Sequence, residues 1–266
     1  MKSNNRYLGA LMIAPFIIFV FLGGIYLKIF TIALSVIGMH EFYRALTNKG
    51  FKPVHLAGYI LLLFYYAMGN DFKSLMFLII LATCILLIVP IMTEKYTFID
   101  CSLTLLGFIY VGVLFSFIYL VSEKNGGNFY VWLIFIGSWM TDTAAYYAGR
   151  FLGKHKLCPR VSPKKTVEGS IGGLLGATIF CGILGIGIVT NHYIDSISLY
   201  HFFIIGALCG VFSQYGDLVA STVKRYVDIK DYGNIIPGHG GILDRFDSIL
   251  FSGVVVFYYL TFIIGI

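Results

Sequence analysis

The chain has 266 residues, of which 58% are hydrophobic and only 12% are charged. Soluble domains carry about 25% charged residues, so this composition excludes an ordinary soluble protein and indicates an all-α, polytopic integral membrane protein. The net charge of +6 would suggest nucleic-acid binding in a soluble chain. No basic stripe with interleaved aromatic residues supports that interpretation, and we expect membrane lipids and anionic substrates as partners instead. The five cysteines are scattered singly, which favours neither a disulfide framework nor a zinc site.

Nine apolar runs are suitable for helices that cross a bilayer, although some are short. They cover residues 8–27, 29–46, 54–69, 74–92, 101–122, 129–149, 169–190, 200–220 and 248–266. The first run follows two basic residues, as in a signal peptide, but a second apolar run follows at once without a cleavage site, so we expect an uncleaved helix. We expect no separate soluble domain. Residues 1–125 form the amino-terminal helices, and residues 126–266 form the carboxy-terminal helices that carry the polar site.

The lysines and arginines predict the orientation of these nine helices, because basic residues accumulate on the cytoplasmic side of a membrane. With the amino terminus inside, 16 of the 19 basic residues fall on one face. The other face receives only Lys28, Lys73 and Lys124. The sequence therefore predicts a cytoplasmic amino terminus, with the loops at 150–165 and 224–245 on the cytoplasmic side.

Two features of the helical runs predict packing rather than chemistry. Glu41 and Arg44 stand three residues apart on one helix, so they can pair near the membrane interface. A series of glycines on the seventh segment allows helices to approach closely. These residues are Gly169, Gly173, Gly176, Gly182, Gly185 and Gly187.

An acidic residue and a basic loop precede the seventh helix. Asp142 lies in an otherwise apolar segment, where an unpaired charge is costly, so it requires a cation or a metal. In the loop that follows, Lys164 and Lys165 are interpreted as ligands of a polyphosphate or lipid phosphate. Arg150, together with Lys154 and Lys156, is interpreted as an anchor that meets anionic headgroups.

The stretch from Ser221 to Asp247 concentrates charged and polar residues between two long apolar runs. If the eighth segment is helical, Asp217, Ser221 and Lys224 lie on one face near its cytoplasmic end. Asp244 and Asp247 stand three apart where the last segment begins. Carboxylates from two such helix ends can form a Mg²⁺ site whose remaining positions are filled by phosphates and water. The alternative is that Asp217 pairs with Lys224 or Arg225. The cluster of Asp244, Arg245 and Asp247 would then simply cap a helix.

His239 lies in a glycine-rich turn within the same stretch. Gly238, Gly240 and Gly241 surround it, and such a composition permits tight turns and lets backbone N–H groups approach an anion. A histidine between glycines is weak evidence by itself and is more often structural than catalytic. Its position inside the charged stretch favours a functional role.

The order of these residues resembles the signature of the phosphatidate cytidylyltransferases, or CDP-diacylglycerol synthases. It reads Ser221-x-Val-Lys224-Arg225, four residues, Lys230-Asp231, then Pro237-x-His239-Gly-Gly-Ile-x-Asp244-Arg245-Phe-Asp247. The segment around Asp142 and the run Ser-Pro-Lys-Lys-Thr-x-Glu-Gly at 162–169 also resemble that family. The specific resemblance covers about residues 138–250, whereas the earlier part matches only in hydropathy.

The resemblance implies an enzyme of phospholipid biosynthesis that converts CTP and phosphatidate to CDP-diacylglycerol and pyrophosphate. It implies dependence on Mg²⁺, with a monovalent cation such as K⁺ as a second ion, and a bacterial inner membrane or its equivalent with the site facing the cytoplasm. Asp217 and Asp244 match the metal-binding aspartates, and Asp142 and Asp247 are further candidate ligands. The catalytic candidates are Ser221, Lys224, Arg225, Lys230, Asp231, His239, Arg245 and Asp247. The candidates for binding substrate phosphates are Lys164, Lys165, Lys224, Arg225 and Arg245.

Three other functions use similar features. A CTP-dependent lipid or polyprenol kinase would need a comparable site for metal and phosphate. A CDP-alcohol phosphatidyltransferase is disfavoured because its Asp-Gly-x-x-Ala-Arg signature is absent. A transporter is disfavoured because the polar residues gather at one membrane face rather than near the midplane. Nothing in the sequence decides whether the protein forms a homodimer.

Overall fold

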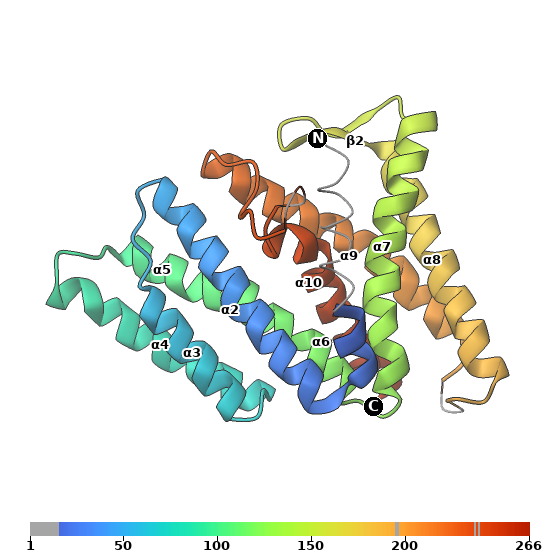
Figure 1. Cartoon of the computed structure of the whole chain (residues 1–266), viewed down its shortest axis with the longest axis horizontal. Coiled ribbons are helices and arrows are strands. Elements are labelled where there is room, and N and C mark those ends of the chain that lie inside the picture. Colours follow the sequence, from blue (N-terminus) through green and yellow to red (C-terminus); the bar gives the residue numbers. More distant parts are fainter. Residues whose placement is uncertain (1–15, 195–196, 237, 239) are drawn as a thin grey trace. The chain divides into compact units, whose positions relative to one another are not determined.

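The computed structural model describes residues 16–194, 197–236, 238 and 240–266 (Figure 1). Residues 8–15 of the predicted first segment, along with Pro237 and His239 of the signature, lie outside these residues. The described chain is predominantly helical and divides into two compact units. The first unit includes Ile25–Ser116 and Tyr226–Arg245, and the second includes Phe117–Arg225 and Phe246–Ile266. The predicted all-α class is confirmed, whereas the division at residue 125 stays a prediction.

The first unit is built from the early helices. They are α2 (Gly24–Asn48), α3 (His55–Ala67), α4 (Phe72–Met92), α5 (Phe98–Gly107) and the π-helical stretch η1 (Phe108–Val113). A capping box begins α5, because the Thr97 hydroxyl accepts the N–H of Asp100 while the Asp100 carboxylate accepts the N–H of Thr97. The buried Tyr43 ring lies against Gly58 and Gly107, where any side chain would collide with it.

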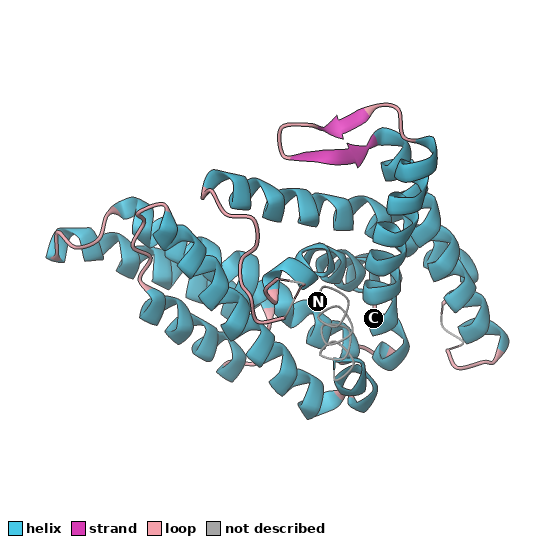
Figure 2. Cartoon of the chain, turned by 45° about the horizontal axis from the view of Figure 1, so that its top comes forward, coloured by secondary structure: helices cyan, strands magenta, loops and turns pink. Residues whose placement is uncertain are grey.

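The second unit contains the later helices and a small β-hairpin. Its elements are α6 (Leu114–Ser122), α7 (Gly127–Leu152), β1 (Lys156–Cys158), β2 (Ser162–Thr166), α8 (Val167–Thr190), α9 (Leu199–Tyr226), α10 (Leu243–Tyr258) and the π-helical η2 (Tyr259–Ile264). Strands β1 and β2 pair antiparallel and join α7 to α8 (Figure 2). The predicted basic loop therefore has a defined structure. Thr166 caps α8 by accepting the N–H of Gly169 at 3.1 Å.

Six helices of the described chain are long and apolar enough to cross a bilayer. They are Gly24–Asn48, Phe72–Met92, Phe98–Ser122, Val167–Thr190, Leu199–Tyr226 and Leu243–Ile264. The protein is therefore a membrane protein. The remaining named helices, α3 and α7, correspond to two further predicted segments; α3 is shorter, with 13 residues, and α7 has 26.

Glycines set how closely α7, α8 and α9 pack, as the sequence predicts, except at Gly187, where a Cβ atom would meet nothing within 4 Å. A Cβ atom on Gly172 or Gly176 would come within 2.3 or 2.5 Å of an alanine Cβ on α7. Farther along α8, a side chain on Gly182 or Gly185 would collide with an aromatic ring of α9. Figure 1 shows α7 and α8 running side by side. Close backbone approach is the packing mode expected where lipid removes the hydrophobic force between helices.

Candidate functional site

The last turns of α9 carry charged and hydroxyl residues on one face. Ser221 Oγ donates a hydrogen bond to Asp217 Oδ1 at 3.3 Å, so these two side chains meet as their spacing predicts. Lys224 and Arg225 occupy the last turn of α9, where positive charge complements the helix dipole. Arg225 Nε also donates to the carbonyl oxygen of Val161 at 3.5 Å, which connects α9 with the β-hairpin.

Asp247 lies next to this face because α10 packs tightly on α9. A Cβ atom on Gly216 would stand 2.4 Å from the Asp247 carbonyl oxygen, so glycine is required for this approach. The Asp247 side chain is 7% exposed, and its Oδ1 accepts the N–H of Ser248 at 2.8 Å. Its electrostatic neighbours are Asp217, Lys224 and Asp142. The carboxylates of Asp217 on α9 and Asp142 on α7 thus both act on Asp247 within the second unit.

A lysine from the β-hairpin completes the group that we call the aspartate cluster, which consists of Asp142, Asp217, Asp247, Lys165 and Lys224. Lys165 Nζ forms an ion pair with Asp217 Oδ2, and both side chains are about one quarter exposed. The predicted alternative paired Asp217 with Lys224 or Arg225 of its own helix, whereas this ion pair joins it to a residue of β2. The cluster therefore combines three carboxyl groups with two ammonium groups, a mixture that offers oxygen ligands to a cation and positive charge to its phosphates.

The cluster fits a magnesium ion that arrives with a polyphosphate. Mg²⁺ is commonly held by one or two carboxylates, with substrate phosphates and water completing its shell. Among the described residues, no three histidine, cysteine, aspartate or glutamate side chains converge closely enough to enclose a metal. The neighbouring carboxylates of Asp217 and Asp247 therefore suit an open site rather than a closed protein cage.

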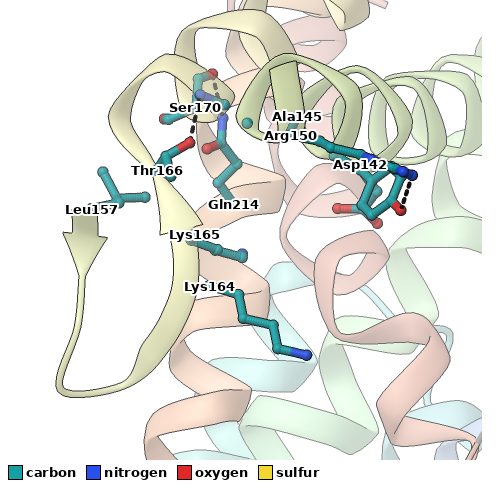
Figure 3. A pocket seen from close by; sticks show the side chains of 12 residues that line it. Asp142, Ala145, Arg150, Leu157, Lys164, Lys165, Thr166, Ser170 and Gln214 are labelled. Atoms are coloured by element: carbon teal, nitrogen blue, oxygen red, sulfur yellow. Dashed lines mark hydrogen bonds between the residues drawn. The ribbon is translucent and has the colours of Figure 1, made fainter. Parts of the chain in front are cut away.

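A cavity of about 360 Å³ adjoins the cluster, and we call it the hairpin cavity (Figure 3). It is bordered by α7, α8, α9 and both strands of the hairpin. Its polar lining residues are Asp142, Tyr146, Arg150, Lys164, Lys165, Thr166, Ser170 and Gln214. Three cationic side chains in one cavity can bind the charged oxygens of phosphates. The predicted phosphate ligands Lys164 and Lys165 therefore lie where such a group could bind.

Two lining residues were not expected from the sequence. Arg150 was interpreted as a headgroup anchor, yet it lines the hairpin cavity, whereas Lys154 and Lys156 do not. Gln214 is 9% exposed and donates from Nε2 to the carbonyl oxygens of Gly210 and Ser170, at 2.7 and 3.1 Å. No motif marks a single glutamine in an apolar helix, so only the packing of α8 on α9 reveals its position.

The rest of the predicted signature belongs to the first unit, in the loop 227–242 between α9 and α10, which we call the signature loop. Asp244, 6% exposed, organises this loop through Oδ2, which accepts the N–H of Tyr232 at 2.7 Å and of Gly241 at 3.0 Å. Gly240 has φ +90°, a conformation that favours glycine. Lys230, Asp231 and Arg245 are exposed. Asp217 and Asp244 belong to different units, so the metal site that they are predicted to share stays a prediction.

Helix α2 holds the signature loop through the two charged residues that were predicted to pair. The carboxylate of Glu41 is 1% exposed and accepts the N–H groups of Ile242 at 3.0 Å and Leu243 at 2.8 Å, which begin α10. Arg44 donates to the carbonyl oxygen of Tyr232 at 2.9 Å. Their role is structural, as expected, but their hydrogen bonds reach a loop about 200 residues away in sequence.

An exposed ion pair marks the start of the signature loop. Lys49 Nζ contacts Asp228 Oδ2, and Asp228 has φ +57°, a left-handed conformation. The hydrogen bond and the charge of Asp228 raise the pKa of Lys49, so the lysine stays protonated at neutral pH. Both side chains face solvent, and such pairs contribute little to stability.

Comparison with known proteins shows to which protein family this chain is similar. The model of the cytidylyltransferase family matches residues 4–263. The chain belongs to this family. A phosphatidate cytidylyltransferase of Staphylococcus saprophyticus is 36% identical over 235 residues, covering 86% of the chain and 87% of that protein. The protein of the same name from Bacillus subtilis is 37% identical over 246 residues, with 88% and 90% covered. One from Staphylococcus haemolyticus is 41% identical over 159 residues, with 59% and 58% covered.

Proposed function

We propose that the protein transfers the cytidylyl group of CTP to phosphatidate, producing CDP-diacylglycerol and pyrophosphate for phospholipid biosynthesis. The observation that carries this proposal is the aspartate cluster beside the cationic hairpin cavity, in a chain of the cytidylyltransferase family. The carboxylates suit a metal-bound polyphosphate, and the basic residues suit its negative charges.

The reaction requires little proton transfer from the protein. The second pKa of a phosphate monoester is near 6, so most phosphatidate is already dianionic at neutral pH. One of its oxygens attacks the α-phosphorus of CTP, and the bond between that phosphorus and the oxygen bridging to the β-phosphate breaks. Pyrophosphate leaves with the bonding electrons. Catalysis then depends on positioning the reactants and neutralising charge.

The residues of the second unit supply both requirements. Lys164, Lys165 and Arg150 would bind phosphate oxygens in the hairpin cavity, and Lys224 would stabilise the departing pyrophosphate. Ser221 would orient the carboxylate of Asp217 through their hydrogen bond.

Asp217 and Asp247 are the carboxylates that we propose hold Mg²⁺, with Asp142 and Asp244 as the other predicted ligands. The ion, when bound, would neutralise charge on the phosphates of CTP. A monovalent cation such as K⁺ would be a second ion of the same site. The support for this assignment is that Asp217 and Asp142 lie close enough to Asp247 for their charges to act on it, and a cation bound among them would relieve that repulsion.

We also propose the finer topology: nine transmembrane helices, a cytoplasmic amino terminus, and a site that faces the cytoplasm of a bacterial inner membrane. The support is the distribution of 16 basic residues on one face and three on the other. The site would then draw on cytosolic CTP. Whether two copies associate stays a prediction.

The position of label in CTP tests the proposed reaction. Purified protein with Mg²⁺, phosphatidate and α-labelled CTP should give a labelled product in the organic phase. With γ-labelled CTP, the label should stay in aqueous pyrophosphate. Transfer of γ-label to a diacylglycerol or polyprenol acceptor would instead show a kinase, and the cytidylyltransferase proposal would be wrong.

A further inference from the structure

A second cavity of about 330 Å³ adjoins the hairpin cavity and differs from it in chemistry. We call it the apolar groove. Its lining comes from α8, α9 and β1 and contains no charged residue: Leu157, Cys158, Ser170, Ile171, Leu174, Val211, Gln214, Tyr215 and Leu218. A site for nucleotide phosphates or metal ions would need charges, so this groove suits an aliphatic ligand.

The two cavities are neighbours that share part of their walls. Leu157, Ser170 and Gln214 line both of them. The Gln214 side chain is fixed at this junction by its hydrogen bonds to backbone carbonyls of α8 and α9. A single ligand that fills both cavities must therefore have an anionic end beside Arg150 and Lys164 and an aliphatic end in the groove.

The groove lies on helix faces that are open to the surroundings of the protein. Ile171 on α8 is 55% exposed, and Tyr215 on α9 is 57% exposed. Both helices are among the candidate membrane spans. Exposed apolar residues on a spanning helix face lipid, so a chain can pass sideways from the bilayer into the groove without crossing water.

We propose that the apolar groove holds one acyl chain of phosphatidate while the phosphate of the same molecule lies in the hairpin cavity. The inference rests on the proposed function and assigns the lipid subsite of that reaction. Lipid tails are as apolar as the groove, so transferring a chain between them changes the free energy little. The groove orients the lipid, and the cationic cavity supplies most of the affinity.

Cys158 provides a direct reporter, because its partly exposed thiol lines the groove. Replacing the exposed Cys84 by serine leaves the buried cysteines Cys101, Cys181 and Cys209 as background. The protein is placed in phosphatidylcholine nanodiscs without CTP, and the rate of maleimide labelling is measured. At a long-chain phosphatidate concentration ten times its dissociation constant, labelling should slow about tenfold, in proportion to the free fraction.

Two other ligands separate the head group from the chain. Dihexanoyl phosphatidate has the same head but short chains, and long-chain diacylglycerol has the chains without the phosphate. Both should leave the labelling rate within about twofold of its starting value, because the short chains do not fill the groove beside Cys158 and diacylglycerol lacks the phosphate that the cationic cavity binds. Equal protection by diacylglycerol would show that any lipid tail enters the groove. Equal protection by the short-chain lipid would show that the long acyl chain is not what covers Cys158. Either result overturns the proposal.

A matched pair of substitutions on α8 tests the same site by kinetics. Ile171→Trp adds bulk inside the groove, whereas Ile183→Trp makes the same change at a residue that is 54% exposed and outside it. Ile171→Trp should abolish the protection of Cys158 and raise KM for long-chain phosphatidate about tenfold, with little effect on the short-chain substrate. Ile183→Trp should change neither. Equal effects of the two substitutions would contradict the groove assignment.

These experiments distinguish failure of the groove proposal from failure of the proposed reaction. Protection of Cys158 by long-chain phosphatidate without any cytidylyl transfer would support the groove and reject the proposed reaction. Normal transfer with no protection, and with Ile171→Trp indistinguishable from Ile183→Trp, would support the reaction and reject the groove.

Discussion

Asp217 interacts with side chains from three elements of the second unit, namely α9, α10 and β2. Its two carboxylate oxygens have separate partners: Ser221 Oγ reaches Oδ1 and Lys165 Nζ reaches Oδ2. Asp247, on α10, is its electrostatic neighbour. A lysine beside a partly exposed carboxylate is a replaceable partner, because a hydrated cation can take its place while the ammonium group binds a phosphate oxygen instead. Asp217 can therefore exchange an ammonium group for a metal ion when the nucleotide binds.

The substitution Asp217→Asn should lower the rate of cytidylyl transfer by about 10²–10³-fold, the usual effect of removing one charge-stabilising group. Its size is unchanged, so the melting temperature in detergent should stay close to that of the parent protein. The rate is measured across a Mg²⁺ titration.

Asp228→Asn is the matched control for this substitution. It makes the same chemical change in an exposed ion pair, and asparagine tolerates the left-handed conformation at that position. The control should retain near-normal activity. A normal Mg²⁺ titration for Asp217→Asn would reject its assignment as a metal ligand.

At the scale of elements, the packing of α10 on α9 sets the distance between the carboxylates of Asp217 and Asp247. Gly216→Ala would place a Cβ atom 2.4 Å from the Asp247 carbonyl oxygen, which is too close for a non-bonded contact between a carbon and an oxygen atom. The collision is with backbone, so α10 must move away from α9. We expect a loss of activity of about 10²-fold, because small displacements of catalytic groups have large effects on rate.

Gly187→Ala on α8 is the control, since a Cβ atom there meets nothing within 4 Å. Alanine is also a better helix former than glycine by about 1 kcal/mol, so this variant should be as stable as the parent or more stable. Activity and melting temperature are measured for both variants. Equal activity of the two would show that the spacing of α9 and α10 does not matter for the reaction.

The helices were predictable from hydropathy, and their deviations have a physical cause. The predicted segment 169–190 corresponds to Val167–Thr190, whereas the predicted segment 200–220 extends to Tyr226 and the predicted 248–266 begins at Leu243. An apolar run measures the thickness of the hydrocarbon layer. Helices α9 and α10 continue beyond that run, and the added turns carry Ser221, Lys224 and Asp247, whereas Asp217 lies inside the predicted segment. Part of the site therefore lies on helix ends that hydropathy alone assigns to loops.

Long-range partners were not predictable, because sequence spacing describes only local geometry. Glu41 and Arg44 stand three apart on α2, so mutual pairing was the natural interpretation. The fold instead brings them to the backbone of the signature loop. Glu41 satisfies two of the N–H groups that every helix leaves unpaired at its first turn. Similarly, the pairing of Lys165 with Asp217 joins a strand to a helix 52 positions later in the chain.

At the scale of the whole molecule, the distribution of charge connects fold and function. A site that binds both a soluble nucleotide and a membrane lipid must lie at one face of the bilayer, where both substrates can reach it. The predicted cytoplasmic face carries 16 of the 19 basic residues. These residues serve two purposes, because the same positive charge that orients the helices also attracts anionic nucleotides and lipids.

Cysteine labelling in oriented vesicles tests this orientation. Cys158, on β1, belongs to a hairpin that we predict to be cytoplasmic, and in a Cys84→Ser protein the other native cysteines are buried. A membrane-impermeant maleimide should therefore label Cys158 in inverted vesicles and spare it in right-side-out vesicles. Lys73 is exposed just inside α4 and is predicted to lie on the opposite face. Lys73→Cys, combined with Cys158→Ser in the same background, should give the reverse pattern, which controls for vesicle sealing and for access of the reagent. If Cys158 reacts only in right-side-out vesicles while the cysteine at position 73 reacts only in inverted ones, the amino terminus is outside. The site could not then draw on cytosolic CTP.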